Sequence, residues 1–588
     1  MEKAKVSFFD IRLFNKIMAF SKPYRLFYYL VFISAILLSV FSTLTPYLLK
    51  IAVDDYITPK LYDGLLIFVV IMLGALLLEV IFQYVFVYYA NWLGQMIVKD
   101  LRQILFEKLI HFKMAYFDRS AVGRLVTRSV SDIETIASIF SQGLFMIIAD
   151  FFKMGIVVFV MLYINWELSL IVFSVLPIIV YATRVFQKSM KKAFEEVRRE
   201  IANMNTFVQE RISGMKIVQL FGRESIEQQT FESINERHKK AWLKTVWFNS
   251  IFFPIAEIST SVTIGLLVWY GGFQSVAGIQ VSLGTLFLFI QLAQMLFRPL
   301  RQIADKFNTL QMGMVAADRV FKIIETESSI EDTGEYEADS IRGEISIKNL
   351  HFSYLKEEKV LRGIDLNVAP GETIAIVGAT GAGKSTLINL ISRFYEFDQG
   401  DIRIDNVSIR DYTLQNLRSH VALVMQEVFL FADTIFNNIT LYNKAITRNE
   451  VIDAAKEIGV HKFIKTLPNG YDYNVKERGV MLSSGQRQLI AFLRAYIANP
   501  TILVLDEATS SIDSFSEELI QKATSKITKN KTSIIIAHRL ATIKKANRII
   551  VMDKGKIVEM GTHDDLINKD GAYNKLHQLQ FSEEETFA

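Results

Sequence analysis

The sequence contains no cysteine among its 588 residues. Disulfides, cysteine-ligated metal sites and a thiol nucleophile are therefore excluded. An excess of one charge is also lacking, because 65 Lys and Arg nearly balance 61 Asp and Glu, for a formal net charge of +4. So small a total predicts no nucleic-acid partner. The first residues, MEKAKVSFFDIRLF, lack the apolar core and small-residue cleavage site of a signal peptide, so we expect a retained amphipathic stretch.

Long apolar runs are abundant, and they lie in the first half of the chain. A membrane-spanning helix needs about 20 residues, because a rise of about 1.5 Å per residue must cross roughly 30 Å of hydrocarbon. The runs reach this length repeatedly, which favours a membrane domain over the buried core of a soluble helical protein. The predicted spans are residues 26–49, 65–90, 137–163, 166–186, 250–272 and 283–297.

The segments between these spans alternate in length and charge. The long segments, 91–136 and 187–249, are rich in Lys and Arg, whereas the short ones are acidic, tiny or uncharged. The positive-inside rule places the long segments and the N-terminus in the cytoplasm. An even number of spans returns the C-terminal half to the same side. The polar, acidic segment 326–342 is expected to link a transmembrane domain, residues 1–325, to a second domain, residues 343–588.

The second half opens with a phosphate-binding pattern. GATGAGKS fits G-x-x-x-x-G-K-S, with a strand-like TIAIV before it and a helix-like STLINLI after it. That context argues against a glycine-rich turn without a ligand. Glycines let backbone N–H groups approach phosphate oxygens, the lysine reaches the β- and γ-phosphates, and the serine ligates Mg²⁺. The predicted ATP-binding residues are Gly378, Ala379, Thr380, Gly381, Ala382, Gly383, Lys384, Ser385 and Thr386.

A second motif, ILVLDE at 502–507, is an apolar run that ends in two acids. Such runs are typical of buried strands in parallel sheets, whose C-terminal ends face ligands. We expect Asp506 to help hold Mg²⁺ and Glu507 to polarise the attacking water. The pair is a weak signal alone and a strong one downstream of the phosphate-binding loop.

With four motifs behind six spans, the chain resembles the ATP-binding cassette (ABC) exporters of the type IV fold. The motifs are GATGAGKST, LSSGQRQL, ILVLDEATSSID and IIIAHRL. The chain is similar to the half-transporters that include bacterial multidrug exporters and the lipid A flippase. The resemblance implies an all-α six-helix transmembrane domain followed by an α/β P-loop nucleotide-binding domain, with a RecA-like core and an ABC helical subdomain. Without cysteine, an exporter with an N-terminal cysteine peptidase is excluded.

The resemblance also assigns roles. It implies that Tyr354 stacks on adenine, that Gln426 contacts Mg²⁺ and water, and that His538 contacts the γ-phosphate. The signature stretch LSSGQ would cap the γ-phosphate of ATP bound to a second subunit, through a helix N-terminus directed at the anion. Its implied contacts are Ser483, Gly485 and Gln486.

Further elements are assigned in the same way. Asp513 ends a loop that crosses the dimer interface in the family, and Glu477 lies in a segment expected to contact the long cytoplasmic helices. The helix tips at 114–125 and 213–224 resemble coupling helices. One P-loop, one signature and six spans in a chain imply half of a complete exporter.

One residue departs from the family pattern L-S-G-G-Q: Ser484 replaces the first glycine. Harmless variation of a small residue is the favoured interpretation. The alternative is a mildly degenerate site, as in some heterodimeric exporters where one subunit keeps the catalytic glutamate while its signature is altered. A homodimer is favoured and a heterodimer remains open.

The expected function is ATP-driven export, or flipping, of hydrophobic or amphipathic compounds such as drugs or lipids across the plasma membrane by alternating access. A membrane-bound ATPase with a regulatory role is the alternative. Partners are a second half-transporter, the substrate and membrane lipids. Charged residues in apolar spans usually face protein or water. Glu79, Asp150 and Glu257 lie in or near the apolar spans and are candidates for contact with the substrate. For Asp150, a local pair with Lys153 is the simpler expectation.

Overall fold

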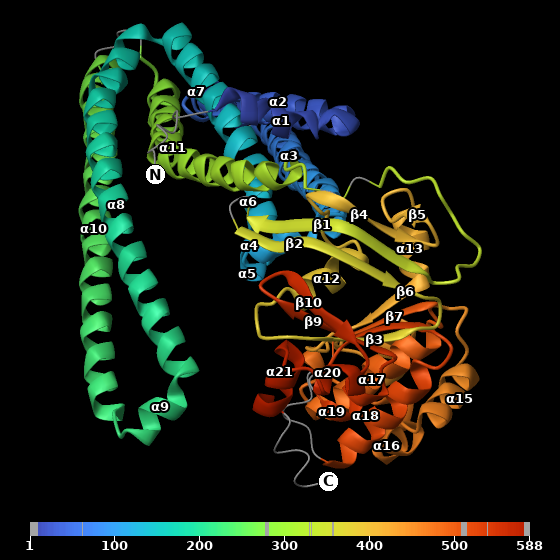
Figure 1. Ribbon diagram of the computed structural model, residues 1–588. Coiled ribbons are helices and arrows are strands. Elements are labelled where there is room, and N and C mark those ends of the chain that lie inside the picture. Colours follow the sequence, from blue (N-terminus) through green and yellow to red (C-terminus); the bar gives the residue numbers. More distant parts are fainter. Residues whose placement is uncertain are drawn as a thin grey trace. The chain divides into compact units, whose positions relative to one another are not determined.

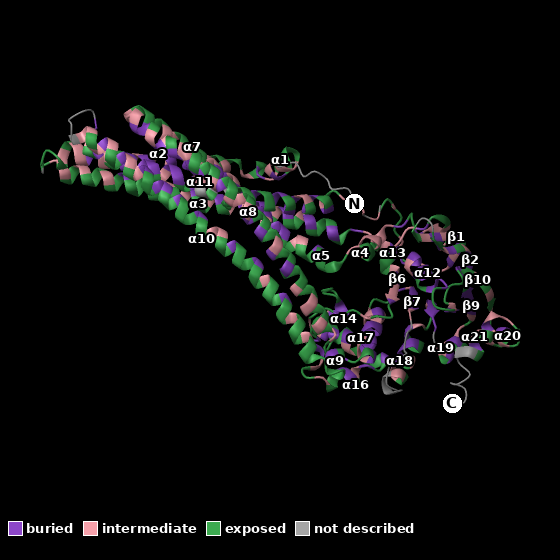
Figure 2. Ribbon diagram, turned by 90° about the vertical axis from the view of Figure 1, so that its left-hand side faces the viewer, coloured by how far each residue is buried: buried purple, intermediate pink, exposed green. Residues whose placement is uncertain are grey.

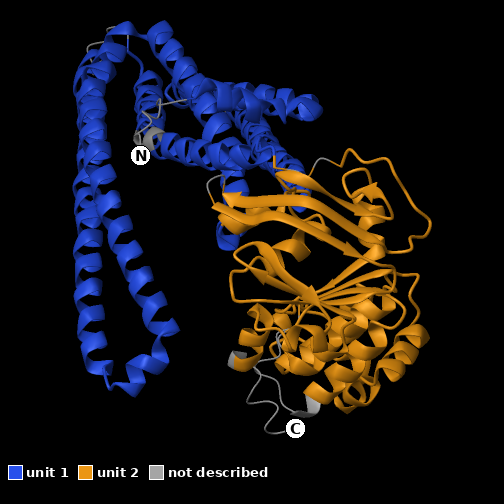
Figure 3. Cartoon of the chain, in the orientation of Figure 1, with its two compact units in different colours: residues 1–110, 121–327 blue, residues 111–120, 328–588 orange. Residues whose placement is uncertain are grey.

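The computed structural model describes residues 10–61, 63–276, 281–328, 330, 332–355, 358–506, 514–537 and 539–580. The chain forms two compact units, shown in Figure 3. Unit 1 contains Met1–Ile110 and Ala121–Glu327, and unit 2 contains His111–Ser120 and Ser328–Ala588. The segment His111–Ser120 falls within the first predicted domain by sequence, yet it packs with unit 2.

In the described residues of unit 1, every regular element is a helix (Figure 1). Six of its helical stretches are long and apolar enough to cross a membrane: Lys22–Ile57, Leu65–Ile110, Val122–Ile164, Trp166–Ser213, Glu224–Ser275 and Leu283–Ile324. Many apolar side chains on them face outward, including Leu66 at 75% exposure, and Figure 2 shows exposed residues along α10 (Glu224–Val276). Outward apolar faces are expected where the solvent is lipid. The six predicted spans are thus confirmed.

The helices of unit 1 continue well beyond a bilayer's thickness. α8 (Trp166–Ser213) has 48 residues, and at 1.5 Å per residue it is about 70 Å long. Its charged half is tied to α10 by ion pairs, Lys244 with Glu196 at 2.7 Å and Arg237 with Glu200 at 3.3 Å. The remaining helices are α1 (Ile11–Ala19), α2 (Arg25–Ile51), α3 (Leu65–Ile110), α5 (Val122–Thr127), α6 (Ile133–Ser138), α7 (Phe145–Ile164), α9 (Met215–Leu220) and α11 (Leu283–Ile324).

One charge in the spans has a different partner from the one its sequence neighbours indicate. Asp150 on α7 forms its ion pair with Lys306 on α11, not with Lys153 three residues away. The side chains of the pair are mostly buried, at 17% and 15% exposure. Helix spacing predicts only neighbours on the same helix, whereas tertiary packing brings α11 against α7.

Unit 2 contains two sheets (Figure 1). An antiparallel sheet has the order β2-β1-β4-β5, and a six-stranded sheet has the order β10-β9-β3-β8-β7-β6. Within the second sheet β6, β7, β8, β3 and β9 run parallel. The strands are β1 (Ile345–Leu355), β2 (Glu358–Val368), β3 (Thr373–Val377), β4 (Gln399–Ile404), β5 (Val407–Ser408), β6 (Val421–Val424), β7 (Ile502–Asp506), β8 (Thr532–Ile536), β9 (Arg548–Asp553) and β10 (Lys556–Gly561).

Helices pack around these sheets, and two apolar cores form. One core lies between the antiparallel sheet, α12 and the parallel sheet. The other joins the parallel sheet to a helical region between β6 and β7. The helices of unit 2 are α4 (Met114–Arg119), α12 (Lys384–Ile391), α13 (Leu414–His420), α14 (Ile435–Thr440), α15 (Arg448–Ile458), α16 (His461–Thr466), α17 (Ser484–Ile497), α18 (Ser514–Ile527), α19 (Leu540–Lys545), α20 (His563–Ile567) and α21 (Ala572–Gln580).

The polar segment that precedes β1 is hydrogen-bonded to other parts of unit 2 at Tyr336 and Ala338. The backbone of Tyr336 donates to Asp411 O at 2.9 Å and accepts from Thr413 N at 3.1 Å. Further on, Asn416 exchanges two hydrogen bonds with the backbone of Ala338, at 3.1 and 3.0 Å. In this part of the predicted linker the chain is therefore fixed to the second unit.

Candidate nucleotide-binding site

The phosphate-binding loop connects β3 to α12, as its pattern predicts. Gly378 and Gly383 have φ angles of +151° and +102°. A Cβ on Gly378 would lie 2.2 Å from the carbonyl oxygen of Met552, and one on Gly383 would lie 2.8 Å from Leu361 Cδ2. Both positions therefore need glycine for space as well as for conformation. The loop ends at the N-terminus of α12, where unpaired N–H groups and the helix dipole favour an anion.

Lys384 lies at the centre of this loop. Its side chain is buried, with 8% of the residue exposed, and Nζ donates to the carbonyl oxygens of Gly378 at 2.7 Å and Ala379 at 3.0 Å. Burial lowers the pKa of Lys384, and the Asp506 carboxylate acts in the opposite direction. A buried cation held by neutral carbonyls is suited to exchange them for phosphate oxygens.

The C-terminal edge of the parallel sheet brings together the oxygen ligands expected for Mg²⁺. Ser385 Oγ, just after the loop, lies 3.5 Å from Asp506 Oδ2 at the end of β7. Gln426 follows β6, which pairs in parallel with β7, and its side chain is exposed at the same edge. Hydroxyl, carboxylate and amide oxygens are donors that Mg²⁺ accepts, so these residues fit the ion.

The described residues contain no group of three or more His, Asp and Glu able to hold a metal by themselves. Glu507, Asp513 and His538 lie outside the described residues. The strands directly before Glu507 and His538, β7 and β8, are adjacent in the sheet.

Tyr354 comes from the other sheet but reaches the same site. It stands on β1, and its hydroxyl donates to Thr386 Oγ1 of α12 at 3.2 Å. Its ring makes edge contacts with Phe352 and Tyr395, at centroid distances of 4.8 and 5.2 Å. The predicted adenine-stacking residue is thus brought to the phosphate-binding helix, with its ring braced by two other aromatic rings.

The signature stretch begins α17, as its sequence indicates. Ser483 is the N-cap: its side chain accepts from Gln486 N at 3.2 Å, and Gln486 Oε1 accepts from Ser483 N at 3.0 Å. Ser484 is the first helical residue and Gly485 is buried. The two polar side chains predicted to contact a γ-phosphate therefore cap their own helix in this single chain.

The nearby segment 476–479 has a strained backbone. Lys476 and Arg478 have φ angles of +60° and +54°, which non-glycine residues rarely adopt. Such strain concentrates at functional loops. Glu477 itself is exposed.

The short helix α4 is part of the segment 114–125 that resembles a coupling helix, and it contributes to the surroundings of Tyr354, a contact for which the sequence gives no signal. Arg119 Nη2 donates to the carbonyl oxygen of Tyr354 at 2.8 Å, and the hydroxyl of Tyr395 donates to the carboxylate of Asp118. Burial, followed by the bond to Asp118, raises the pKa of Tyr395. A cavity of about 430 Å³ lies between α4, the end of β1 and the turn after α12.

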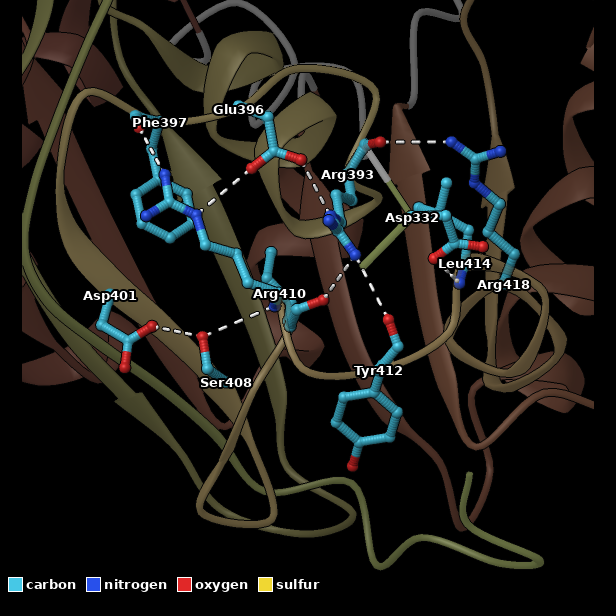
Figure 4. A network of polar contacts seen from close by, with 11 residues as sticks. Asp332, Arg393, Glu396, Phe397, Asp401, Ser408, Arg410, Tyr412, Leu414 and Arg418 are labelled. Atoms are coloured by element: carbon cyan, nitrogen blue, oxygen red, sulfur yellow. Dashed lines mark hydrogen bonds and ion pairs between the residues drawn. The ribbon is translucent and has the colours of Figure 1, made fainter. Parts of the chain in front are cut away.

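Arg393, two residues before Tyr395, fixes the segment that holds this contact. It is 3% exposed and has a φ of +49°. Its Nε donates to Glu396 at 2.9 Å, and its Nη1 donates to the carbonyl oxygens of Ile409 and Tyr412, each at 3.2 Å (Figure 4).

A second arginine reinforces the same turn. Arg410 donates to Glu396 at 3.2 Å and to the carbonyl oxygen of Phe397 at 2.7 Å, and its guanidinium lies 3.8 Å from the centre of the Phe397 ring (Figure 4). The turn after α12 is therefore rigidly tied to the segment 409–412. No sequence signal pairs Asp118 with Tyr395, 277 positions away.

Comparison with known proteins agrees with this geometry. Residues 28–300 match the family model described as the ABC transporter transmembrane region, and residues 361–510 match the model described as ABC transporter. The ATP-dependent lipid A-core flippase of Syntrophus aciditrophicus is 39% identical over 84% of this chain and 82% of its own length.

Other relatives cover more of the chain. The ATP-dependent lipid A-core flippase of Thiobacillus denitrificans is 34% identical over 97% of this chain and 99% of its own length. The uncharacterized ABC transporter ATP-binding protein YknV of Bacillus subtilis is 32% identical over 96% and 94%. Both alignments include the transmembrane and the nucleotide-binding regions.

Proposed function

The chain belongs to the ABC transporter family, as a half-transporter of an ATP-driven exporter with several membrane spans. We propose that two identical copies form the pump and export a lipid or lipid-like amphiphile. The observation that carries the proposal is Ser385 Oγ lying 3.5 Å from Asp506 at the phosphate-binding loop of a chain with six candidate spans. An ATP site and a membrane domain in one chain are the minimum for coupling hydrolysis to movement across the bilayer.

The roles proposed for the site follow from its residues. Lys384 and the loop from Gly378 hold the triphosphate, and Tyr354 receives the adenine. Ser385, Gln426 and Asp506 hold Mg²⁺, which would neutralise charge on the β- and γ-phosphates. Glu507 polarises the attacking water and His538 contacts the γ-phosphate; for both the support is sequence position after adjacent parallel strands.

Dimerisation is supported by the presence of a single P-loop and a single signature stretch in each chain. Each chain has one P-loop and one LSSGQ stretch, so two copies supply two complete sites, with Ser483, Gly485 and Gln486 of one copy facing the γ-phosphate held by the other. Two exposed apolar surfaces in the described residues also suit coverage by a second subunit. One is the tip around α9, and the other follows β6; their exposed members are Ile217, Leu220, Phe221, Met425, Phe429 and Phe431.

The substrate class is supported by the relatives named lipid A-core flippase and by the outward apolar faces of unit 1. We place the pump in the plasma membrane, the inner one where there are two, with unit 2 in the cytoplasm where ATP is. Two side chains in or near the spans have contacts already: Asp150 pairs with Lys306, and Glu79 accepts from Thr45 at 3.3 Å. These contacts support structural roles for Asp150 and Glu79, and Glu257 is not assigned one.

The test is ATP-dependent lipid flipping in sealed vesicles by the purified chain. The wild type should move a fluorescent lipid only with hydrolysable ATP. Glu507→Gln should bind ATP and stop both turnover and flipping, and Lys384→Ala should lose nucleotide binding or hydrolysis. Robust hydrolysis without flipping of any lipid or drug in a panel would refute the pump and favour a regulatory ATPase.

The homodimer has its own test. The chain purified alone should be dimeric and hydrolyse ATP, and Ser484→Gly should leave turnover within about a factor of two, because Ser and Gly are both small and both tolerated at a helix start. Inactivity cured only by a second, different subunit would establish a heterodimer instead.

A further inference from the structure

A cavity of about 420 Å³ lies between the beginning of α8 and the end of α10 in unit 1. Trp166, Trp269 and Tyr270 line it, and Glu167 is the one charged residue among its lining residues. No role assigned above uses this cavity. Its lining places aromatic faces beside a carboxylate.

The Glu167 carboxylate is fixed in place and keeps its charge uncompensated. Its Oε2 accepts from the hydroxyl of Tyr270 at 2.9 Å and from Nε2 of Gln274 at 3.0 Å. Both donors are neutral, and no Lys or Arg forms an ion pair with Glu167 among the described residues. Asn165 caps α8 by accepting from Leu168 N at 2.9 Å, so the turn that carries Glu167 is itself held.

By the positive-inside rule, the cavity belongs at the non-cytoplasmic surface of the membrane. Asn165 and the first two residues of α8, Trp166 and Glu167, form a short connection without Lys or Arg, which is typical of the non-cytoplasmic side. Trp166 and Trp269 are 62% and 74% exposed, and such rings favour the level of the lipid headgroups. The ligands present at the highest local concentration there are lipid headgroups of the non-cytoplasmic leaflet.

We propose that this cavity binds the ammonium headgroup of a lipid in the non-cytoplasmic leaflet. An alkylammonium group is attracted both to a carboxylate and to the faces of Trp and Tyr rings. A headgroup with a net negative charge would be repelled by Glu167. The site is separate from the ATP site and does not depend on which compound the pump exports.

Two simpler roles make different predictions. If Trp166 and Trp269 only anchor the helices in the interface, all headgroups interact equally. If Glu167 only ties α8 to α10 through Tyr270, then removing that tie should matter as much as removing the charge.

The experiment uses the full-length chain in nanodiscs, with Trp92, Trp242 and Trp247 replaced by phenylalanine so that Trp166 and Trp269 alone report. The discs contain phosphatidylethanolamine, phosphatidylcholine or phosphatidylglycerol brominated on the acyl chains near the glycerol, mixed with unlabelled lipid. Bromine quenches tryptophan at contact, so quenching measures the occupancy of the site. We expect the two ammonium lipids to be preferred over phosphatidylglycerol by about tenfold in relative binding constant.

Matched variants separate charge from structure. Glu167→Gln retains an acceptor for Tyr270 and should abolish the headgroup preference, whereas Asp63→Asn, which removes another exposed carboxylate from a non-cytoplasmic loop, should preserve it. Tyr270→Phe removes one donor of the tie but keeps the ring and the charge, and should also preserve it. Equal quenching by all three lipids in the wild-type background, or a preference that survives Glu167→Gln, or one lost equally in Tyr270→Phe, would overturn the proposal.

Discussion

Removing a single hydroxyl, in Tyr395→Phe, is expected to weaken the coupling between α4 and the nucleotide site. The hydroxyl donates to the Asp118 carboxylate, and the ring braces Tyr354 at a centroid distance of 5.2 Å. Phenylalanine keeps the ring and loses only the hydrogen bond. Hydrogen bonds to charged groups contribute about 1.5–3 kcal/mol, but Asp118 is exposed, so we expect about 1 kcal/mol, or about fivefold in the docking equilibrium of α4.

The assay compares ATP turnover in reconstituted vesicles with and without transported lipid. Tyr395→Phe and Asp118→Ala should each retain basal turnover and lose most of the lipid stimulation, and the double variant should lose no more than either single variant, because both remove the same bond. Tyr496→Phe is the matched control, since it removes a hydroxyl bonded to Glu457 elsewhere in unit 2. Unchanged stimulation in both single variants, or additive losses in the double variant, would refute the reasoning.

Three further predictions concern unit 2. Ser483→Ala and Thr447→Ala each remove a helix cap and should destabilise by about 1 kcal/mol in thermal unfolding, but only Ser483→Ala should also lower ATP turnover at saturating ATP. Gly378→Ala should lose nucleotide binding and at least about 1–3 kcal/mol of stability, because its Cβ would meet Met552 O at 2.2 Å at a φ of +151°; near-native binding would contradict this. Burial raises the pKa of Tyr412 to about 12 by favouring the neutral phenol, so its contribution to stability should be intact below about pH 10 and lost as pH rises through 12, and Tyr412→Phe should show a smaller alkaline loss.

Local patterns were sufficient for elements whose physics is local. The length of the apolar runs predicted the six spans. The pattern G-x-x-x-x-G-K-S between a strand-like and a helix-like run predicted the phosphate-binding loop. The start of α17 was also predictable, because Ser483 and Gln486 have the spacing of a capping box. In each case the residues that decide the structure lie within one helix or one turn of each other.

Contacts between distant segments were not predictable in the same way. Asp150 has a cation three residues away, yet it pairs with Lys306, because packing of α11 against α7 brings a second cation to it. Arg393 gives no sequence signal for its positive φ; that conformation is held by three acceptors on segments up to 19 residues away. A single sequence contains no local pattern that identifies such pairs.

Tyr354 links α4 to the phosphate-binding helix α12, and this link should couple the docking of α4 to the affinity for ATP. Its side chain bonds Thr386 of the phosphate-binding helix, and its backbone carbonyl bonds Arg119 of α4. If α4 helps to hold Tyr354 in position for adenine, docking of α4 raises the affinity for ATP, and ATP must then raise the docking of α4 by the same factor. Arg119→Gln should therefore raise the Kd for ATP while Arg448→Gln, which breaks a surface pair with Asp472 in the same unit, leaves it unchanged. An equal Kd for both variants would exclude Tyr354 as the link between nucleotide and α4.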